Sequence, residues 1–184
     1  METHRVLLHI PGFMNTTKAQ QLSALALATL LCIAGAELFN FLTDDAFIAF
    51  RYISQRHNGF GYTWNAPPWL PVEGYTSFAW IVILDIIWTL SGIMPPSAAN
   101  GVSLLCSLGT LMVFAHWLAQ ITKVDEKPSI GLFALGVLGL ATHRVFLTWT
   151  SSGLETALFN LLLLIWVRCA FEIRKQRPAF HWGF

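Results

Sequence analysis

The stretch that decides the fold is residues 22–42, LSALALATLLCIAGAELFNFL, whose only charged residue, Glu37, lies near its end. A helix of about twenty apolar residues is long enough to cross the hydrocarbon core of a bilayer. Four more apolar segments follow, at 76–94, 101–121, 129–149 and 154–171. These runs are apolar on all faces, whereas the strands of a membrane barrel alternate apolar and polar residues. We therefore predict an all-α membrane protein built as a multi-pass helical bundle.

The composition agrees with this prediction. Of the 184 residues, 55% are hydrophobic and only 11% are charged, against about 25% charged in a typical soluble domain. The formal net charge is +1. A surface that follows nucleic-acid phosphates needs a basic excess, so we expect no nucleic-acid partner and expect membrane lipid around the helices.

The distribution of charges divides the chain into three regions. Residues 1–21 form a polar N-terminal tail, 22–171 the transmembrane module, and 172–184 a basic C-terminal tail. Lysine and arginine tend to stay in the cytosol, so we expect both tails there. Within the module, residues 43–75 break the apolar pattern and form a polar loop between the first two apolar segments.

The number of crossings follows from the same rule. Five full crossings would place the basic tail 172–184 outside the cytosol, whereas four place both tails inside. Segment 76–94 carries Asp85 at its middle, and a carboxylate at the bilayer centre costs about 2.5–3.5 kcal/mol. We therefore predict that 76–94 lies at the interface or enters only partly. Loop 43–75 and the turn at residues 151–155 then share the outer side.

The polar loop opens with the acidic pair Asp44 and Asp45, at the start of a predicted short amphipathic helix. Thr43 or Asp44 is suited to cap that start. Two neighbouring carboxylates can deprotonate an acceptor hydroxyl, or hold a divalent cation against a phosphate. They can equally serve only to stabilise the positive end of the helix dipole.

Five motifs, taken in order, resemble the GT-C superfamily of glycosyltransferases, in particular the terminal arabinofuranosyltransferase-like bacterial proteins. They are Asp-Asp-Ala-Phe-Ile-x-x-Arg-Tyr (44–52), Asn-Gly-x-Gly (58–61), Trp-Asn (64–65), Val-Glu-Gly-Tyr-Thr-Ser (72–77) and Ser-Gly-Leu-Glu-Thr-Ala-Leu-Phe (152–159). The resemblance implies an inverting enzyme of the bacterial inner membrane. Such an enzyme transfers a sugar, for example a pentofuranose, from a polyprenyl-phosphate donor to an extracytoplasmic glycan or lipid acceptor.

The resemblance also implies roles for individual residues. Asp44 matches the catalytic base, with Asp45 as a second acid, and the pair is the expected site if a divalent cation is required. Arg51 either pairs with Asp44 or contacts the donor phosphate as a bidentate fork. The remaining residues implied in substrate binding are Tyr52, Asn65, Glu73, Tyr75, Arg144 and Glu155.

Members of that family have more helices than the five apolar segments found here. The resemblance therefore implies the N-terminal portion of such an enzyme, or a chain whose bundle is completed by a second chain. Two other interpretations remain open on the sequence. One is a non-catalytic membrane scaffold subunit or truncated remnant of such an enzyme, and the other is a small transporter component that uses Asp85 and Glu37.

Overall fold

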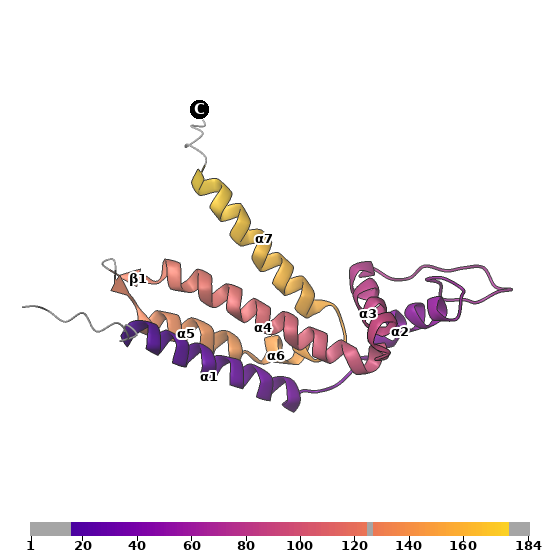
Figure 1. The fold of residues 1–184 in the computed structure, drawn as a ribbon, viewed down its shortest axis with the longest axis horizontal. Coiled ribbons are helices and arrows are strands. Elements are labelled where there is room, and N and C mark those ends of the chain that lie inside the picture. Colours follow the sequence, from indigo (N-terminus) through magenta and orange to yellow (C-terminus); the bar gives the residue numbers. More distant parts are fainter. Residues whose placement is uncertain (1–15, 125–126, 177–184) are drawn as a thin grey trace, which may run out of the picture.

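The computed structural model describes residues 16–124 and 127–176, and the regular secondary structure in this part of the chain is helical apart from one minimal hairpin (Figure 1). The helices are α1 (Thr16–Leu38), α2 (Asp44–His57), α3 (Phe78–Ser91), α4 (Pro95–Ile121), α5 (Ile130–Ala141), α6 (Arg144–Thr150) and α7 (Thr156–Gln176). Two antiparallel strands, β1 (Lys123–Val124) and β2 (Lys127–Pro128), join α4 to α5. The prediction of an all-helical chain is confirmed for these residues.

The ends of α1 and α7 differ from the predicted tail boundaries. Helix α1 begins at Thr16, inside the predicted tail 1–21, and α7 continues to Gln176, inside the predicted tail 172–184. The other tail residues, 1–15 and 177–184, lie outside the described part of the chain.

Three of the described helices are long and apolar enough to cross a membrane: α1, α4 and α7. A fourth span exists if α5 and α6, which are bent by 49° at the break between them, count as one. The predicted segment 129–149 is thus two helices. The break occurs where Thr142 ends α5 and the His143 side chain accepts a hydrogen bond from Phe146 N to begin α6.

Helix α3 is shorter than the other apolar helices. Its 14 residues extend about 21 Å at 1.5 Å per residue, less than the hydrocarbon core of about 30 Å. Figure 1 shows α3 lying across the end of the bundle rather than alongside the long helices. Gly92, with a φ of 74°, ends the helix in the left-handed conformation that glycine tolerates best.

The bundle of α1, α4 and α5 packs through small side chains. Its core contains Ala28, Leu111, Ala115, Phe133, Val137 and Ala141. Small residues let helices approach closely, which matters in a bilayer because lipid already solvates apolar side chains. Gly136 of α5 illustrates this approach, because a Cβ built there would lie 2.4 Å from Leu118 Cδ2 of α4.

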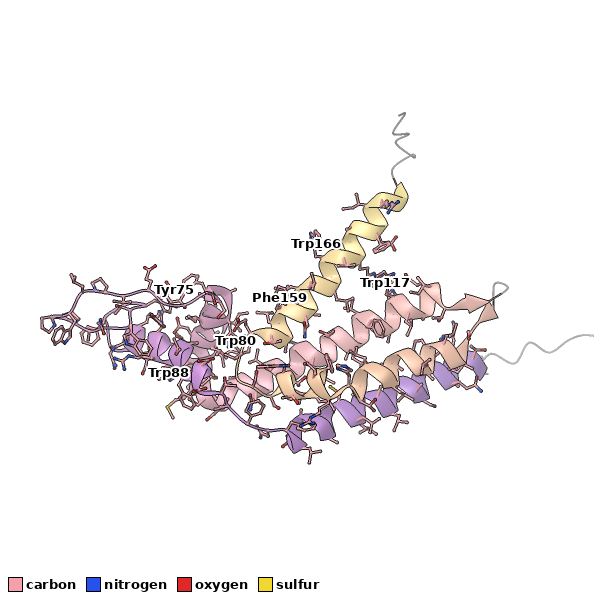
Figure 2. All side chains as sticks on the ribbon, turned by 180° about the vertical axis from the view of Figure 1, so that it is seen from behind. Tyr75, Trp80, Trp88, Trp117, Phe159 and Trp166 are labelled. Carbon is pink, nitrogen blue, oxygen red and sulfur yellow. The ribbon has the colours of Figure 1, made fainter. Side chains whose placement is uncertain are left out.

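A second core lies between α2 and α3, beyond the end of that bundle. It contains Phe50, Tyr52 and Ile53 of α2 together with Trp80, Ile81 and Leu84 of α3. Figure 2 shows Tyr75, Trp80 and Trp88 at this end of the molecule, and Trp117, Phe159 and Trp166 along α4 and α7. Helix α7 leans away from α1 and α5 in the same view, and 6% of its apolar window is buried.

We predict that Gly136→Leu lowers the stability of the α4–α5 pair by about 1–3 kcal/mol, because the added side chain must displace Leu118. Gly139→Leu is the matched control, since the same helix carries Gly139 with open space beside it. Thermal unfolding of the purified variants in one detergent measures the difference. Equal unfolding midpoints for the two variants would contradict this packing.

Candidate functional site

The turn at residues 151–153 holds the start of α2 in place. The Ser152 carbonyl oxygen accepts hydrogen bonds from Thr43 N (3.0 Å) and Thr43 Oγ1 (3.2 Å). The Ser151 carbonyl accepts from Phe41 N (3.3 Å), and Ser151 Oγ donates to the Phe39 carbonyl (2.8 Å). The connection between α1 and α2 is therefore attached through its backbone to a segment more than a hundred residues away.

Gly153 brings this turn against α2. It has a φ of 79°, and a Cβ at this position would lie 2.6 Å from Leu42 Cδ2 and 3.0 Å from Ala46 Cβ. The positive φ and the lack of room for a Cβ atom both favour glycine at this position. Its carbonyl oxygen also accepts a hydrogen bond from Trp80 Nε1 (3.1 Å), so the same turn is joined to α3.

Thr43 caps α2, as the sequence predicts. Thr43 Oγ1 accepts a hydrogen bond from Ala46 N at 3.3 Å, which satisfies one of the free amide groups at the helix start. Asp44 and Asp45 lie exposed in the first turn, where carboxylates are favoured by the helix dipole. The dipole alone accounts for an acidic pair here, so a functional role has to come from what surrounds it.

Asp44 lines a hollow of about 490 Å³ on one face of α2. It is lined by Asp44, Phe47, Ile48, Phe50, Arg51, Ser54 and Trp64. Asp44, Ile48 and Arg51 share this face because positions i, i+4 and i+7 of a helix point the same way. One carboxylate and one guanidinium therefore face a common hollow among aromatic and aliphatic side chains.

Arg51 does not pair with Asp44, which was one of the two predicted roles. Its Nε donates to the Trp64 carbonyl (3.0 Å), and its guanidinium lies 4.3 Å from the centroid of the Trp64 ring. This arrangement fixes a planar cation on the wall of the hollow. The predicted alternative, a contact between Arg51 and a donor phosphate, stays a prediction.

Asp45 lies outside the hollow. Adjacent helix positions are about 100° apart around the axis, so the two carboxylates of the acidic pair point in different directions. Among the residues that the structure describes, no group of three or more His, Cys, Asp or Glu side chains could hold a metal ion. Asp44 and Asp45 therefore do not form a cage for a divalent cation with any third such side chain in that part of the chain.

Two predicted substrate contacts have structural roles. Tyr52 is 1% exposed, and its hydroxyl donates to the Val72 carbonyl (3.2 Å). Asn65 Nδ2 donates to the Leu70 carbonyl (3.3 Å) and so closes the turn between them. Tyr52 and Asn65 shape the loop rather than project into the hollow.

The next two predicted contacts lie on the part of the loop that leads back to α3. Glu73 is exposed, and Tyr75 is half-buried with its ring edge-on to Tyr52 at 4.8 Å. Tyr75 also stacks on Phe78, the first residue of α3, at 5.4 Å. Neither Glu73 nor Tyr75 lines the hollow that contains Asp44.

The last two predicted residues lie at different distances from α2. Arg144 begins α6 and is exposed. Arg144 does not line the hollow. Glu155 is half-buried and follows the turn that contacts Ala46 through Gly153. Glu155 is therefore at the same end of the molecule as Asp44 but does not line its hollow.

Asp85 is the residue whose importance the sequence analysis missed. Its side chain is 4% exposed, and its Oδ1 accepts from Arg56 Nη1 and His57 Nε2, each at 2.9 Å. Its Oδ2 accepts a hydrogen bond from the Tyr62 hydroxyl. The His57 ring stacks on Trp88 at 3.9 Å. A buried carboxylate of α3 thus binds the end of α2 and the turn that follows it.

The environment of Tyr62 reflects this contact. Burial, the hydrogen bond to Asp85 and the charge of Asp85 together raise the pKa of the Tyr62 phenol to about 12. The phenol therefore stays protonated and donating at physiological pH. The sequence carries a signal for this cluster. Asp85 is a single carboxylate within an apolar segment, and Arg56, His57 and Tyr62 precede that segment.

Comparisons with known proteins add no relative: no family model, no curated protein and no solved structure matches this chain. The likeness to the GT-C glycosyltransferases therefore rests on the ordered motifs between residues 44 and 159 alone.

We predict that Asp85→Asn weakens the attachment of α2 to α3 by about 2 kcal/mol, because the hydrogen bonds from Arg56 and His57 then reach a neutral amide oxygen and lose their charge assistance. Trypsin cleavage after Arg56, followed over time in the folded protein, is expected to become faster. Asp44→Asn is the control, because its exposed side chain has no such contacts. Unchanged cleavage in Asp85→Asn would show that the cluster does not hold the loop.

Proposed function

We propose that this chain is a multi-pass helical module of a membrane glycosyltransferase of the bacterial inner membrane. In this proposal it transfers a sugar, such as a pentofuranose, from a polyprenyl-phosphate donor to an extracytoplasmic glycan or lipid acceptor. The observation that carries the proposal is the hollow on α2, in which Asp44 and Arg51 face the same space. The ordered motifs that resemble GT-C enzymes give the reaction class.

The apolar helices support the membrane placement. Helices α1, α4 and α7 are each long and apolar enough for a span, and the proposal counts the bent pair α5 and α6 as a fourth. Four spans return the chain to the side from which it began. The short α3, placed crosswise in Figure 1, suits an interfacial position beside α2. The hollow then opens outside the cytosol, at the level of the lipid headgroups.

The spacing of the two charged groups suits a single displacement. Asp44 and Arg51 are seven residues apart, which is about 10 Å along the helix axis. A sugar ring bound between them would carry its phosphate toward Arg51 and receive the acceptor hydroxyl from the side of Asp44. Attack and departure on opposite faces of the anomeric carbon invert its configuration.

The chain's residues supply each part of that step. The Asp44 carboxylate takes the proton of the acceptor hydroxyl while the hydroxyl oxygen forms a bond to the anomeric carbon. The bond between that carbon and the phosphate oxygen breaks, and the polyprenyl phosphate leaves with the bonding electrons. The Arg51 guanidinium, held by Trp64, stabilises the negative charge on the departing phosphate.

The proposed topology predicts the side on which two connections lie. A reporter domain fused after Met94 should be found outside the cytosol, because α3 does not cross. A reporter fused after Lys127, at the far end of α4, should be found in the cytosol. Reporters that are active only outside and only inside the cytosol measure this, and both fusions on one side would contradict four spans.

The proposed chemistry predicts that Asp44→Asn lowers the transfer of sugar from a polyprenyl-phosphate donor by about a hundredfold or more, since a general base contributes that much. Glu37→Gln is the control, because Glu37 is an exposed acid at the end of α1, outside the hollow. Membranes containing the full chain and its native partners, with a panel of donor sugars, provide the assay. Full activity in Asp44→Asn would exclude this residue as the base.

A non-catalytic scaffold subunit is the competing proposal, and the Asp85 cluster favours it because that cluster fixes the loop without facing the hollow. The two proposals differ in the effect of Asp44→Asn. In a scaffold, this substitution leaves both assembly and transfer unchanged, whereas in the transferase it lowers transfer.

A further inference from the structure

We propose that a groove between α1 and α4, at the end of the bundle opposite Asp44, binds one anionic phospholipid. The acyl chain would lie between the two helices, and the phosphate would meet Lys18. This proposal goes beyond glycosyl transfer and requires only that α1 and α4 cross a membrane.

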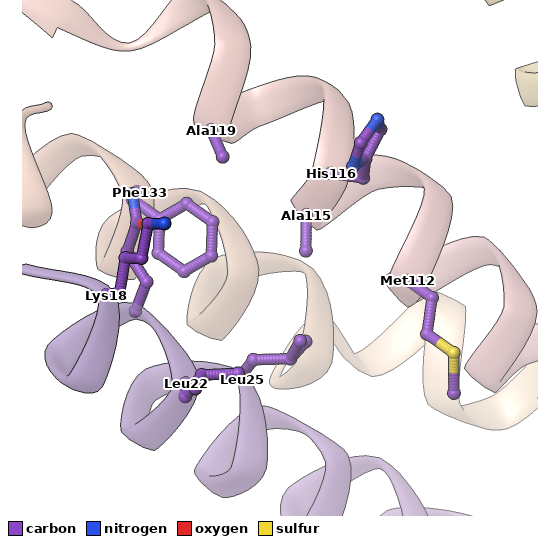
Figure 3. A pocket seen from close by; sticks show the side chains of 9 residues that line it. Lys18, Leu22, Leu25, Met112, Ala115, His116, Ala119 and Phe133 are labelled. Carbon is purple, nitrogen blue, oxygen red and sulfur yellow. The ribbon is translucent and has the colours of Figure 1, made fainter. Parts of the chain in front are cut away.

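The groove has a volume of about 380 Å³, and Figure 3 shows it from close by. Leu22 and Leu25 of α1 form one wall, Met112 and Ala115 of α4 form the other, and Phe133 of α5 closes the back. From Lys18 to Leu25 the groove follows α1 for about 10 Å. This depth accepts the first half of an acyl chain beneath its headgroup.

The groove exists because α4 presents small side chains toward α1. Ala115 and Ala119 are four residues apart and therefore lie on the same face of α4. Ala115 belongs to the core of the bundle and is 3% exposed, whereas Ala119 is half-buried at the groove. A larger residue at either position would fill the space that the lipid chain occupies.

Lys18 lies at one end of the groove, and the other polar residues of its lining, Gln21 and His116, lie nearer its middle. Helices α1 and α4 run in opposite directions (Figure 1), so the first turn of α1 and the last turns of α4 meet at that end. Lys18 and Gln21 come from α1 and His116 from α4. Gln120 Nε2 donates to His116 Nε2 at 3.0 Å, which steadies the imidazole.

The charge of this lining selects the occupant. Lys18 is the charged side chain of the described lining, and no carboxylate accompanies it there. A cation above an apolar channel that opens sideways from the helices complements a phosphate joined to an acyl chain. The phospholipids that surround a membrane helix have this structure. We therefore take a phospholipid with a negatively charged headgroup as the occupant of the groove.

The test uses native mass spectrometry of the full-length detergent-purified chain, titrated with phosphatidylglycerol or phosphatidylcholine of the same acyl chains. Wild-type protein should retain one phosphatidylglycerol more strongly than phosphatidylcholine. Lys18→Gln should reduce this preference about fivefold, the value of one lysine contact with an anionic lipid. Arg168→Gln is the charge-matched control, because Arg168 lies on α7 and does not line the groove.

A second pair of variants tests the apolar channel. Ala119→Leu should abolish the retained lipid peak for both lipids, whereas Ala26→Leu, an exposed position of α1, should leave it unchanged. Equal retention of the two lipids by the wild type would overturn the proposal. So would equal losses in Lys18→Gln and Arg168→Gln, or a dimer mass that disappears in Ala119→Leu, since a second copy of the chain would then be the occupant.

Discussion

The carbonyl groups of the turn at 151–153 are the constraint on which the rest of the structure depends. They accept hydrogen bonds from the backbone of the α1–α2 connection, from Thr43 and from the Trp80 indole. Together with the hydrogen bonds from Asn100 Nδ2 of α4 to Asn40 Oδ1 and the Phe41 carbonyl, they attach the start of α2 to the bundle. Because buried carbonyls need partners, the turn and the loop satisfy one another, and Asp44 is carried on a helix of fixed position.

The Asp85 carboxylate performs the corresponding role at the other end of α2. A buried carboxylate is unfavourable unless it is paired and hydrogen-bonded, and here Arg56, His57 and Tyr62 provide that compensation. Helix α2 is thus fixed at its start by backbone hydrogen bonds and at its end by a charge cluster. The hollow between these two attachments is the part of α2 left open to a ligand, with Arg51 stacked on Trp64 at its wall.

Much of this architecture could be predicted from local sequence. The apolar runs predict the long helices, and Thr43 is the predicted cap of α2. The seven-residue spacing of Asp44 and Arg51 predicts that they share one face of that helix. These features depend on helix geometry alone. The break between α5 and α6 was signalled by His143 and Arg144, but an apolar run of membrane length favoured one continuous segment.

The contacts that arise from tertiary packing could not be predicted in this way. Tyr52 carries a polar tip that can equally meet a sugar or a backbone carbonyl, and only the position of Val72 decides between them. Arg144 was assigned to substrate binding by the resemblance, yet helix α6 separates it from the turn at 151–153. Asp85 was judged as an isolated cost within an apolar segment, because its three partners lie 23 to 29 residues earlier in the chain.

The two ends of the bundle differ in chemistry. One end holds a carboxylate and a guanidinium above α2, and the other holds a lysine above an apolar groove between α1 and α4. In this account the first end receives the phosphate of a lipid-linked sugar, and the second is occupied by a structural lipid. Both depend on the same placement of α1 and α4 in the bilayer.

Photoaffinity labelling tests the central claim, that the α2 hollow receives a lipid-linked phosphate, without requiring turnover or a second chain. The probe is a polyprenyl phosphate with a diazirine next to its phosphate, and labelled peptides are mapped by mass spectrometry. The account predicts adducts within residues 44–64 that unlabelled polyprenyl phosphate displaces and that Arg51→Gln reduces. Adducts confined to other helices, or labelling of 44–64 that Arg51→Gln leaves unchanged, would contradict it.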